Sequence, residues 1–179
     1  MRPLLDLSRL IDGLSELLGK LATVLTFLAC MVSAGNAFSR YLFGYGSNAL
    51  IEVQWYLFSA IFLLAAGYAL KHNEHVRVDI LYGHLSGRAR LWIDLLGGLF
   101  FLLPLCVVMI WLGGEFFALS YRSGETSNDY GGLLRWPVKL LLPLGFAFLL
   151  LQGVSEIVKR IAALRGEAKI DTTYEKPVQ

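Results

Sequence analysis

Four long runs without any charged residue limit the folds open to this chain more than any other feature. They cover residues 21–39, 53–70, 95–114 and 140–155. An α-helix rises about 1.5 Å per residue, and the hydrocarbon core of a bilayer is roughly 30 Å thick, so about 20 apolar residues can cross it. The fourth run is short, but apolar residues on both sides extend it and Lys139 can snorkel to the interface. The pattern predicts four transmembrane helices.

Composition agrees with a membrane protein. Hydrophobic residues make up 56% of the chain and charged residues 17%, and the mean hydropathy of +0.57 exceeds what a soluble core requires. We therefore expect an all-α integral membrane protein with one four-helix transmembrane domain over residues 1–165. The expected spans are about 21–41, 52–70, 93–114 and 137–158, followed by a polar cytoplasmic tail over 166–179.

The segment before the first span has a helical pattern of its own. Its leucines recur at three- and four-residue intervals, while its charged residues fall on the opposing face, which predicts an amphipathic helix over about residues 3–18. Such a helix either lies on the membrane surface or docks against a partner protein. The acidic residues and the length of this segment argue against a cleaved signal peptide.

The distribution of Lys and Arg sets the expected orientation. Of the 16 Lys and Arg residues, twelve lie in the N-terminal segment, the 71–94 connection and the tail, and four lie in the other two connections. Positive residues near spans are retained on the cytoplasmic side. Both termini are therefore expected in the cytoplasm, and the connections near residues 44 and 125 in the periplasm.

Several other classes of function are unsupported. The basic residues are spread along the chain, which argues against nucleic acid as a partner. Cys30 and Cys106 lie inside apolar runs, so neither a disulfide framework nor a redox pair is expected. His72, His75 and His84 could be drawn as a zinc site, but the connection that holds them has no cysteine and is rich in cations. No histidine lies in a span, as haem ligation would require. We expect no metal, no cofactor and no enzymatic activity.

Three stretches carry a resemblance to a known family: GNAFSRYLFG, then IEVQWYLFSAIFLLAAGYALKHNEHVRVDIL, then SGETSNDYGGLLRWPVKLLLPLGFAFLLLQGVSEIVKR. Together they resemble the small membrane subunit, of DctQ type, of tripartite ATP-independent periplasmic (TRAP) transporters. The likeness covers roughly residues 30–160, and Glu74 departs from it, since a small residue is more frequent there in the family. The family positions matched here are Asn36, Arg40, Tyr41, Glu52, His75 to Asp79, Trp136, Pro137, and Pro143 to Phe146.

The resemblance implies a bacterial inner-membrane protein that works with two partners. A periplasmic substrate-binding protein delivers an organic acid or related solute, and a large membrane subunit of DctM type carries the solute with Na⁺ by an elevator-type motion. The small subunit is the stationary scaffold. The residues agree independently, because no span contains, near the middle of the membrane, an acid, a base or a histidine that could bind a coupling ion or a substrate carboxylate. The alternative is a four-helix scaffold or redox-complex subunit unrelated to transport.

The candidate site residues are therefore interface and structural residues. Glu52 either pairs with Arg40 across the first hairpin, which we favour, or is solvated. Trp55 is expected as a lipid anchor at headgroup depth. In the connection after the second span, Arg77 can reach phosphates or carbonyl groups, Asp79 can cap the following turn, and His75 can hydrogen-bond beside them. Candidate contacts for the binding protein are Arg122, Glu125, Asp129 and Arg135.

Overall fold

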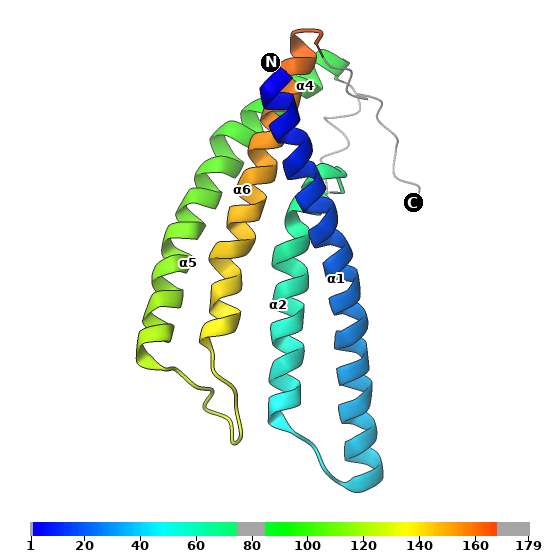
Figure 1. The fold of residues 1–179 in the computed structure, drawn as a ribbon, viewed down its shortest axis with the longest axis vertical. Helices are drawn as coiled ribbons and strands as arrows, with labels where there is room; N and C mark the ends of the chain where they lie inside the picture. Colours follow the sequence, from blue (N-terminus) through cyan, green and yellow to red (C-terminus); the bar gives the residue numbers. More distant parts are fainter. Residues whose placement is uncertain (1, 75–84, 168–179) are drawn as a thin grey trace.

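The computed structural model describes residues 2–74 and 85–167 as a set of long helices (Figure 1). The elements are α1 (Arg2–Phe43), α2 (Asn48–Lys71), α4 (Gly87–Gly97), the π-helical turn η1 (Gly98–Leu102), α5 (Leu103–Ser123) and α6 (Trp136–Leu164). Four helical segments are long and apolar enough to cross a membrane. The prediction of an all-α protein with four such helices is confirmed.

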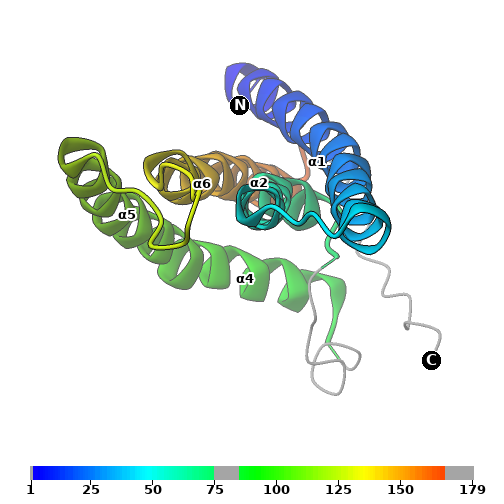
Figure 2. The same ribbon diagram turned by 90° about the horizontal axis from the view of Figure 1, so that it is seen from below.

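The helices form an open arrangement rather than a closed ring (Figure 2). α2 and α6 pack against each other in the middle, α1 packs on both of them, and α5 packs on α6. We call the end that holds the start of α1 and the end of α6 the terminal end. The opposite end, with the connections 44–47 and 124–135, is the hairpin end. His75, Arg77, Asp79 and His84 lie outside the described residues, as does most of the expected tail.

α1 differs from the expected division into a surface helix and a separate span. It continues without a break through both ranges, 3–18 and 21–41. Its 42 residues correspond to about 63 Å, roughly twice the thickness of the hydrocarbon core. The reason is local, because no proline interrupts the expected junction, and Gly13 and Gly19 lower the helix propensity there without ending the helix.

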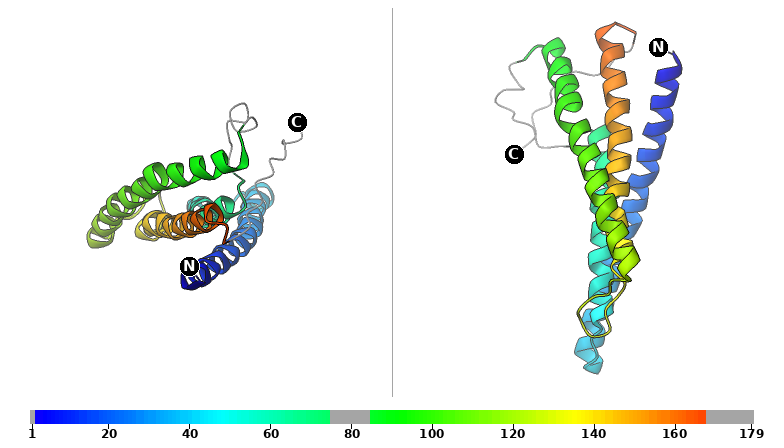
Figure 3. Two further views of the ribbon diagram at one scale, coloured as in Figure 1. Left: turned by 90° about the horizontal axis from the view of Figure 1, so that it is seen from above. Right: turned by 90° about the vertical axis from the view of Figure 1, so that its left-hand side faces the viewer.

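The third span is one long helix that changes its winding in the middle. α4, η1 and α5 run together from Gly87 to Ser123, and they cross the other helices obliquely (Figure 3). The π-turn ends two residues before Pro104, which lacks an N–H and whose ring would crowd the carbonyl of Phe100 in a regular α-helix. Ser86 begins the helix as its N-cap and accepts a hydrogen bond from the Ala89 amide.

Small residues allow the central helices to approach closely. A Cβ atom added to Gly145 of α6 would lie 2.6 Å from the Cβ of Leu63 on α2, and one added to Gly19 of α1 would lie 2.4 Å from the Tyr68 ring. Gly113 of α5 similarly faces Pro143 of α6, where an added Cβ would lie 3.2 Å from the proline Cδ. Association of membrane helices depends on such close packing, since lipid tails are as apolar as leucine.

Candidate functional site

At the hairpin end, Asn36 fixes the connection between α1 and α2. Its side chain is buried, and its Oδ1 accepts a hydrogen bond from the Ser47 amide at 3.4 Å. Ser39 donates to the Tyr45 carbonyl at 3.0 Å, and Gly44 adopts the left-handed backbone conformation with φ +64°. The end of α1 therefore holds the turn through side chains that point toward it.

Glu52 of α2 joins the two hairpins. Its Oε2 accepts a hydrogen bond from the Leu133 amide at 2.7 Å. Within residues 2–74 and 85–167 no ion pair joins Glu52 to Arg40, so the favoured pairing of these two residues is wrong. The carboxylate turns toward the second connection, because a backbone N–H there lacks a helical partner and an acceptor satisfies it.

Two further hydrogen bonds run beside that of Glu52. Tyr56 of α2 donates its hydroxyl to the Leu134 carbonyl at 2.8 Å, and the Asn48 side-chain amide donates to the Tyr130 carbonyl at 3.3 Å. The segment around residues 130–134 is thus attached to the start of α2 at three points. The two hairpins form one surface at this end.

The second connection is also braced by its own charges. Glu125 accepts a hydrogen bond from Lys139 at the start of α6, and Arg135 lies 3.8 Å from the other Glu125 oxygen. The Lys139 ammonium holds the pKa of Glu125 below its ordinary value. The brace is therefore present throughout the neutral range and weakens only in strong acid, as the pH falls through that lowered pKa.

The four candidate docking residues consequently fall into two groups. Glu125 and Arg135 are engaged within the chain. Arg122, in the last turn of α5, and Asp129, near the tip of the connection, are exposed. Tyr130 beside Asp129 is 96% exposed, although its carbonyl is fixed by Asn48.

Trp136 and Pro137 begin α6, and Trp55 lies on the outside of α2. Pro137 occupies the first turn, where its missing N–H costs nothing. The Trp136 ring packs edge-on against Phe117 and Tyr121 of α5, with centroid distances of 6.4 and 5.6 Å. Trp55 is 69% exposed. Trp136 thus packs between helices of this chain, whereas Trp55 is directed away from them.

At the terminal end, sequence reasoning missed a polar network centred on Asp12 of α1. The Asp12 Oδ1 accepts hydrogen bonds from three α6 side chains: Gln152 at 2.9 Å, Ser155 at 3.0 Å and Lys159 at 3.1 Å. Ser15 donates to the Gln152 Oε1 at 2.7 Å. Gln152 and Ser155 are fully buried, so these bonds satisfy groups that water cannot reach.

The network extends from α6 to the neighbouring helices. Glu156 accepts from Lys159 at 2.5 Å and from Arg160. Arg160 also donates to the Asp94 carboxylate of α4 at 3.3 Å. Separately, Glu16 of α1 lies 2.7 Å from the Lys71 ammonium and 2.8 Å from the His72 Nε2 at the end of α2. Charged side chains thus connect α1, α2, α4 and α6 at one level of the bundle.

The N-terminal part of α1 packs against α6 of the same chain, whereas the sequence predicted that it lies on the membrane surface or docks against a partner protein. Its buried face is small and polar, with Ser8, Ser15 and Ala22 among its buried residues. The apolar face points outward and contains the exposed leucines 4, 7, 10, 17 and 21. A signal was present in the sequence, because Ser8, Asp12, Ser15, Gly19 and Ala22 recur at alternating four- and three-residue intervals.

Of the three histidines drawn as a zinc site, His75 and His84 lie outside the described residues. His72 contacts Glu16, and its ring lies 4.3 Å from that of Tyr68 between centroids. Among residues 2–74 and 85–167, no group of three His, Cys, Asp or Glu side chains could hold a metal ion.

Comparison with known proteins shows the family to which the chain belongs. No curated protein is a significant match to the chain. Residues 28–163, however, match the family described as "Tripartite ATP-independent periplasmic transporters, DctQ component". This match spans most of the chain; it begins inside the first membrane-crossing segment and covers most of the other three. The chain is a multi-pass membrane protein and belongs to the DctQ family of tripartite ATP-independent periplasmic transporter components.

Proposed function

We propose that this chain is the stationary small subunit of a Na⁺-coupled TRAP transporter that imports an organic acid or related solute. One observation carries the proposal. The middle of every span, residues 21–39, 53–70, 95–114 and 140–155, contains no charged side chain and no histidine. A route for an anion and its coupling ions needs such groups near the middle of the bilayer. The large DctM-type membrane subunit, the partner of this chain, therefore carries the solute across the membrane.

The internal braces of the bundle support a scaffold role. Polar contacts tie α1, α2, α4 and α6 at the terminal end. At the hairpin end, Glu52, Tyr56 and Asn48 tie α2 to the connection before α6. An element that stays still while a neighbour slides must not deform, and the braces at both ends oppose relative motion of these helices.

We assign the hairpin end to the periplasm and the terminal end to the cytoplasm of a bacterial inner membrane, from the distribution of Lys and Arg. The periplasmic binding protein would then meet the connection 124–135. Arg122 and Asp129 are the better candidates for its docking, because Glu125 and Arg135 already pair within the chain. His75, Arg77 and Asp79 remain candidate contacts on the cytoplasmic side.

Co-purification tests the proposal. The chain is expressed together with a large DctM-type membrane subunit from the same organism, with an affinity tag on only one of the two. The scaffold role predicts that the untagged protein is recovered with the tagged one in mild detergent. Recovery of the chain alone, while an unrelated tagged membrane protein from the same host keeps its own partner, would contradict the proposal.

A further inference from the structure

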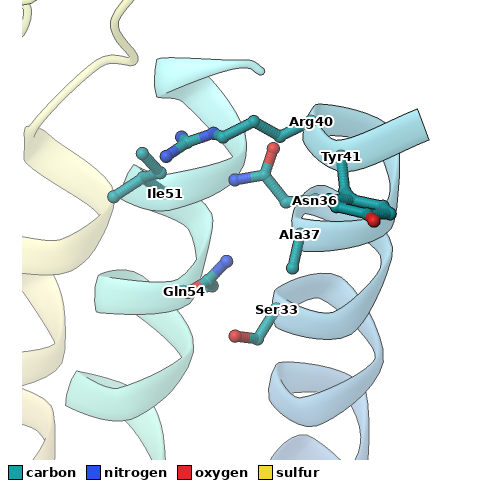
Figure 4. Close-up of a pocket in the computed structure, with 7 residues that line it drawn as sticks. All are labelled: Ser33, Asn36, Ala37, Arg40, Tyr41, Ile51 and Gln54. Atoms are coloured by element: carbon teal, nitrogen blue, oxygen red, sulfur yellow. The ribbon is translucent and has the colours of Figure 1, made fainter. Parts of the chain in front are cut away.

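A polar cleft lies between α1 and α2 at the hairpin end (Figure 4). Its volume is about 560 Å³. Its lining includes Ser33, Asn36, Arg40 and Tyr41 of α1, and Ile51 and Gln54 of α2. The Arg40 side chain extends from α1 toward α2 across one end of the cleft, and Ser33 and Gln54 face each other at the other end (Figure 4). Most of these side chains can donate hydrogen bonds.

Arg40 brings a positive charge to this cleft without a neutralising carboxylate. Glu52, the nearest acid along the sequence, is engaged by the Leu133 amide of the other hairpin. Within residues 2–74 and 85–167, no ion pair involves Arg40. The guanidinium lies against the turn between the helices, because a Cβ atom added to Gly46 would lie 2.9 Å from the Arg40 Nε. The exposed Arg40 side chain thus lies along the turn beside the cleft.

The position of the cleft along the helices indicates the class of anion. Arg40 ends the uncharged run of α1, whereas Ser33 and Gln54 lie within uncharged runs. The guanidinium therefore lies near headgroup depth, and the neutral donors lie deeper. Tyr41, which lines the cleft and is 88% exposed, offers apolar surface beside the guanidinium. A phospholipid has this order of groups, with a phosphate above, ester carbonyl oxygens below it, and acyl chains beyond.

We propose that this cleft binds a phospholipid, with the Arg40 guanidinium on the phosphate and with Gln54 and Ser33 donating to the ester region. A planar guanidinium suits phosphate oxygens because it donates two parallel hydrogen bonds. This inference goes beyond the scaffold role and needs no transport activity. It explains why a cation is kept at the end of α1 although the acid across the hairpin is used elsewhere.

Native mass spectrometry of the full-length chain in mild detergent tests the inference. Dioleoyl phosphatidylglycerol is compared with dioleoylglycerol, which has the same acyl chains and no phosphate. We expect the phospholipid to be retained, and Arg40→Gln to weaken its binding about tenfold. Arg40→Lys keeps the charge and should retain most of the binding. Arg122→Gln is the matched control, since Arg122 is an exposed arginine at the same end, and should leave binding unchanged.

Three results would overturn the inference. One is equal retention of both lipids, and another is an equal loss in Arg122→Gln. The third is displacement of the lipid by millimolar inorganic phosphate, which would assign the site to a free anion. A carboxylate of the large membrane subunit is the remaining alternative ligand of Arg40. It would be indicated if no variant changed lipid binding while Arg40→Gln abolished co-purification with the large subunit, and the lipid assignment would then be wrong. Circular dichroism melts of each variant show whether folding is retained.

Discussion

Glu52 connects two hairpins that are far apart in the sequence. Its position before the second uncharged run identified it as a structural residue, but its partner could not be predicted. The donor is a backbone N–H 81 residues away, and a backbone amide carries no sequence signal. Charge complementarity pointed instead to Arg40, the only other charged residue near this turn. A carboxylate that accepts a hydrogen bond from an otherwise unpaired amide stabilises the protein more than one in an exposed ion pair.

Substitution of Glu52 tests this contact. Glu52→Leu removes the acceptor of the Leu133 N–H and should lower the melting temperature in mild detergent. Glu52→Gln keeps an amide oxygen in the same place and should lower it less. Glu115→Leu, an exposed acid on α5, is the control and should have little effect. If Glu52→Leu and Glu115→Leu behave alike, the connection between the hairpins is not stabilised by Glu52.

At the scale of elements, α1 shows what a helical pattern can and cannot establish. The periodicity correctly predicts a helix with one apolar face. In water that face would be buried against protein. In a membrane, however, lipid covers an apolar face as well as protein does. The polar face then gains more from burial, because its groups find partners in α6. Periodicity alone does not show whether the apolar or the polar face of a membrane helix packs on the protein. In α1 the polar face packs on α6, so the leucines are exposed.

A double-mutant cycle on Asp12 and Lys159 tests the polar network. Asp12→Asn leaves Lys159 paired only with Glu156, and Lys159→Met leaves the partly buried Asp12 carboxylate without its cation, so each should destabilise the protein. The coupling free energy should be about 1–3 kcal/mol, as for other contacting pairs in a network. The exposed pair of Asp6 and Arg9, 3.2 Å apart on the outside of α1, is the control and should give less than about 1 kcal/mol. Equal coupling in the two cycles would contradict the network's role.

Gly145 tests the packing of α2 against α6. Gly145→Ala would place a Cβ atom 2.6 Å from the Leu63 Cβ and 3.0 Å from its carbonyl oxygen, so the helices must separate. We expect a loss of about 1–3 kcal/mol, typical of overpacking. Gly114→Ala is the matched control, because nothing lies within 4 Å of its added Cβ, and it should be neutral or stabilising. If both variants melt alike, the helices are not in close contact.

At the scale of the whole molecule, the spans were the most predictable feature. Charged residues mark their ends, since the bilayer tolerates few charges in its core. The helices extend beyond the expected limits, with α6 continuing through Glu156, Lys159 and Arg160 to Leu164, because paired charges can remain in a helix past the hydrocarbon. The oblique course of the third span and the cleft beside Arg40 depend on tertiary packing, and the sequence did not predict them.

The orientation of the molecule can be tested by labelling single cysteines in a variant that lacks Cys30 and Cys106. A cysteine at Asp129, in the connection 124–135, should react with a membrane-impermeant thiol reagent added outside intact cells. A cysteine at Ser86, at the start of α4, should react only after the membrane is permeabilised. The opposite labelling would reverse the assignment of the two ends and move the binding-protein contact away from residues 122–135.

Solute uptake into proteoliposomes tests the central claim that this chain is a scaffold without a transport route of its own. The liposomes contain the chain alone, the large subunit alone, or both, with a Na⁺ gradient and the binding protein loaded with the solute that it retains on purification. We predict no uptake by the chain alone and full uptake only when both subunits are present. Uptake by the chain alone, carried out at the rate of the complete system, would contradict the account.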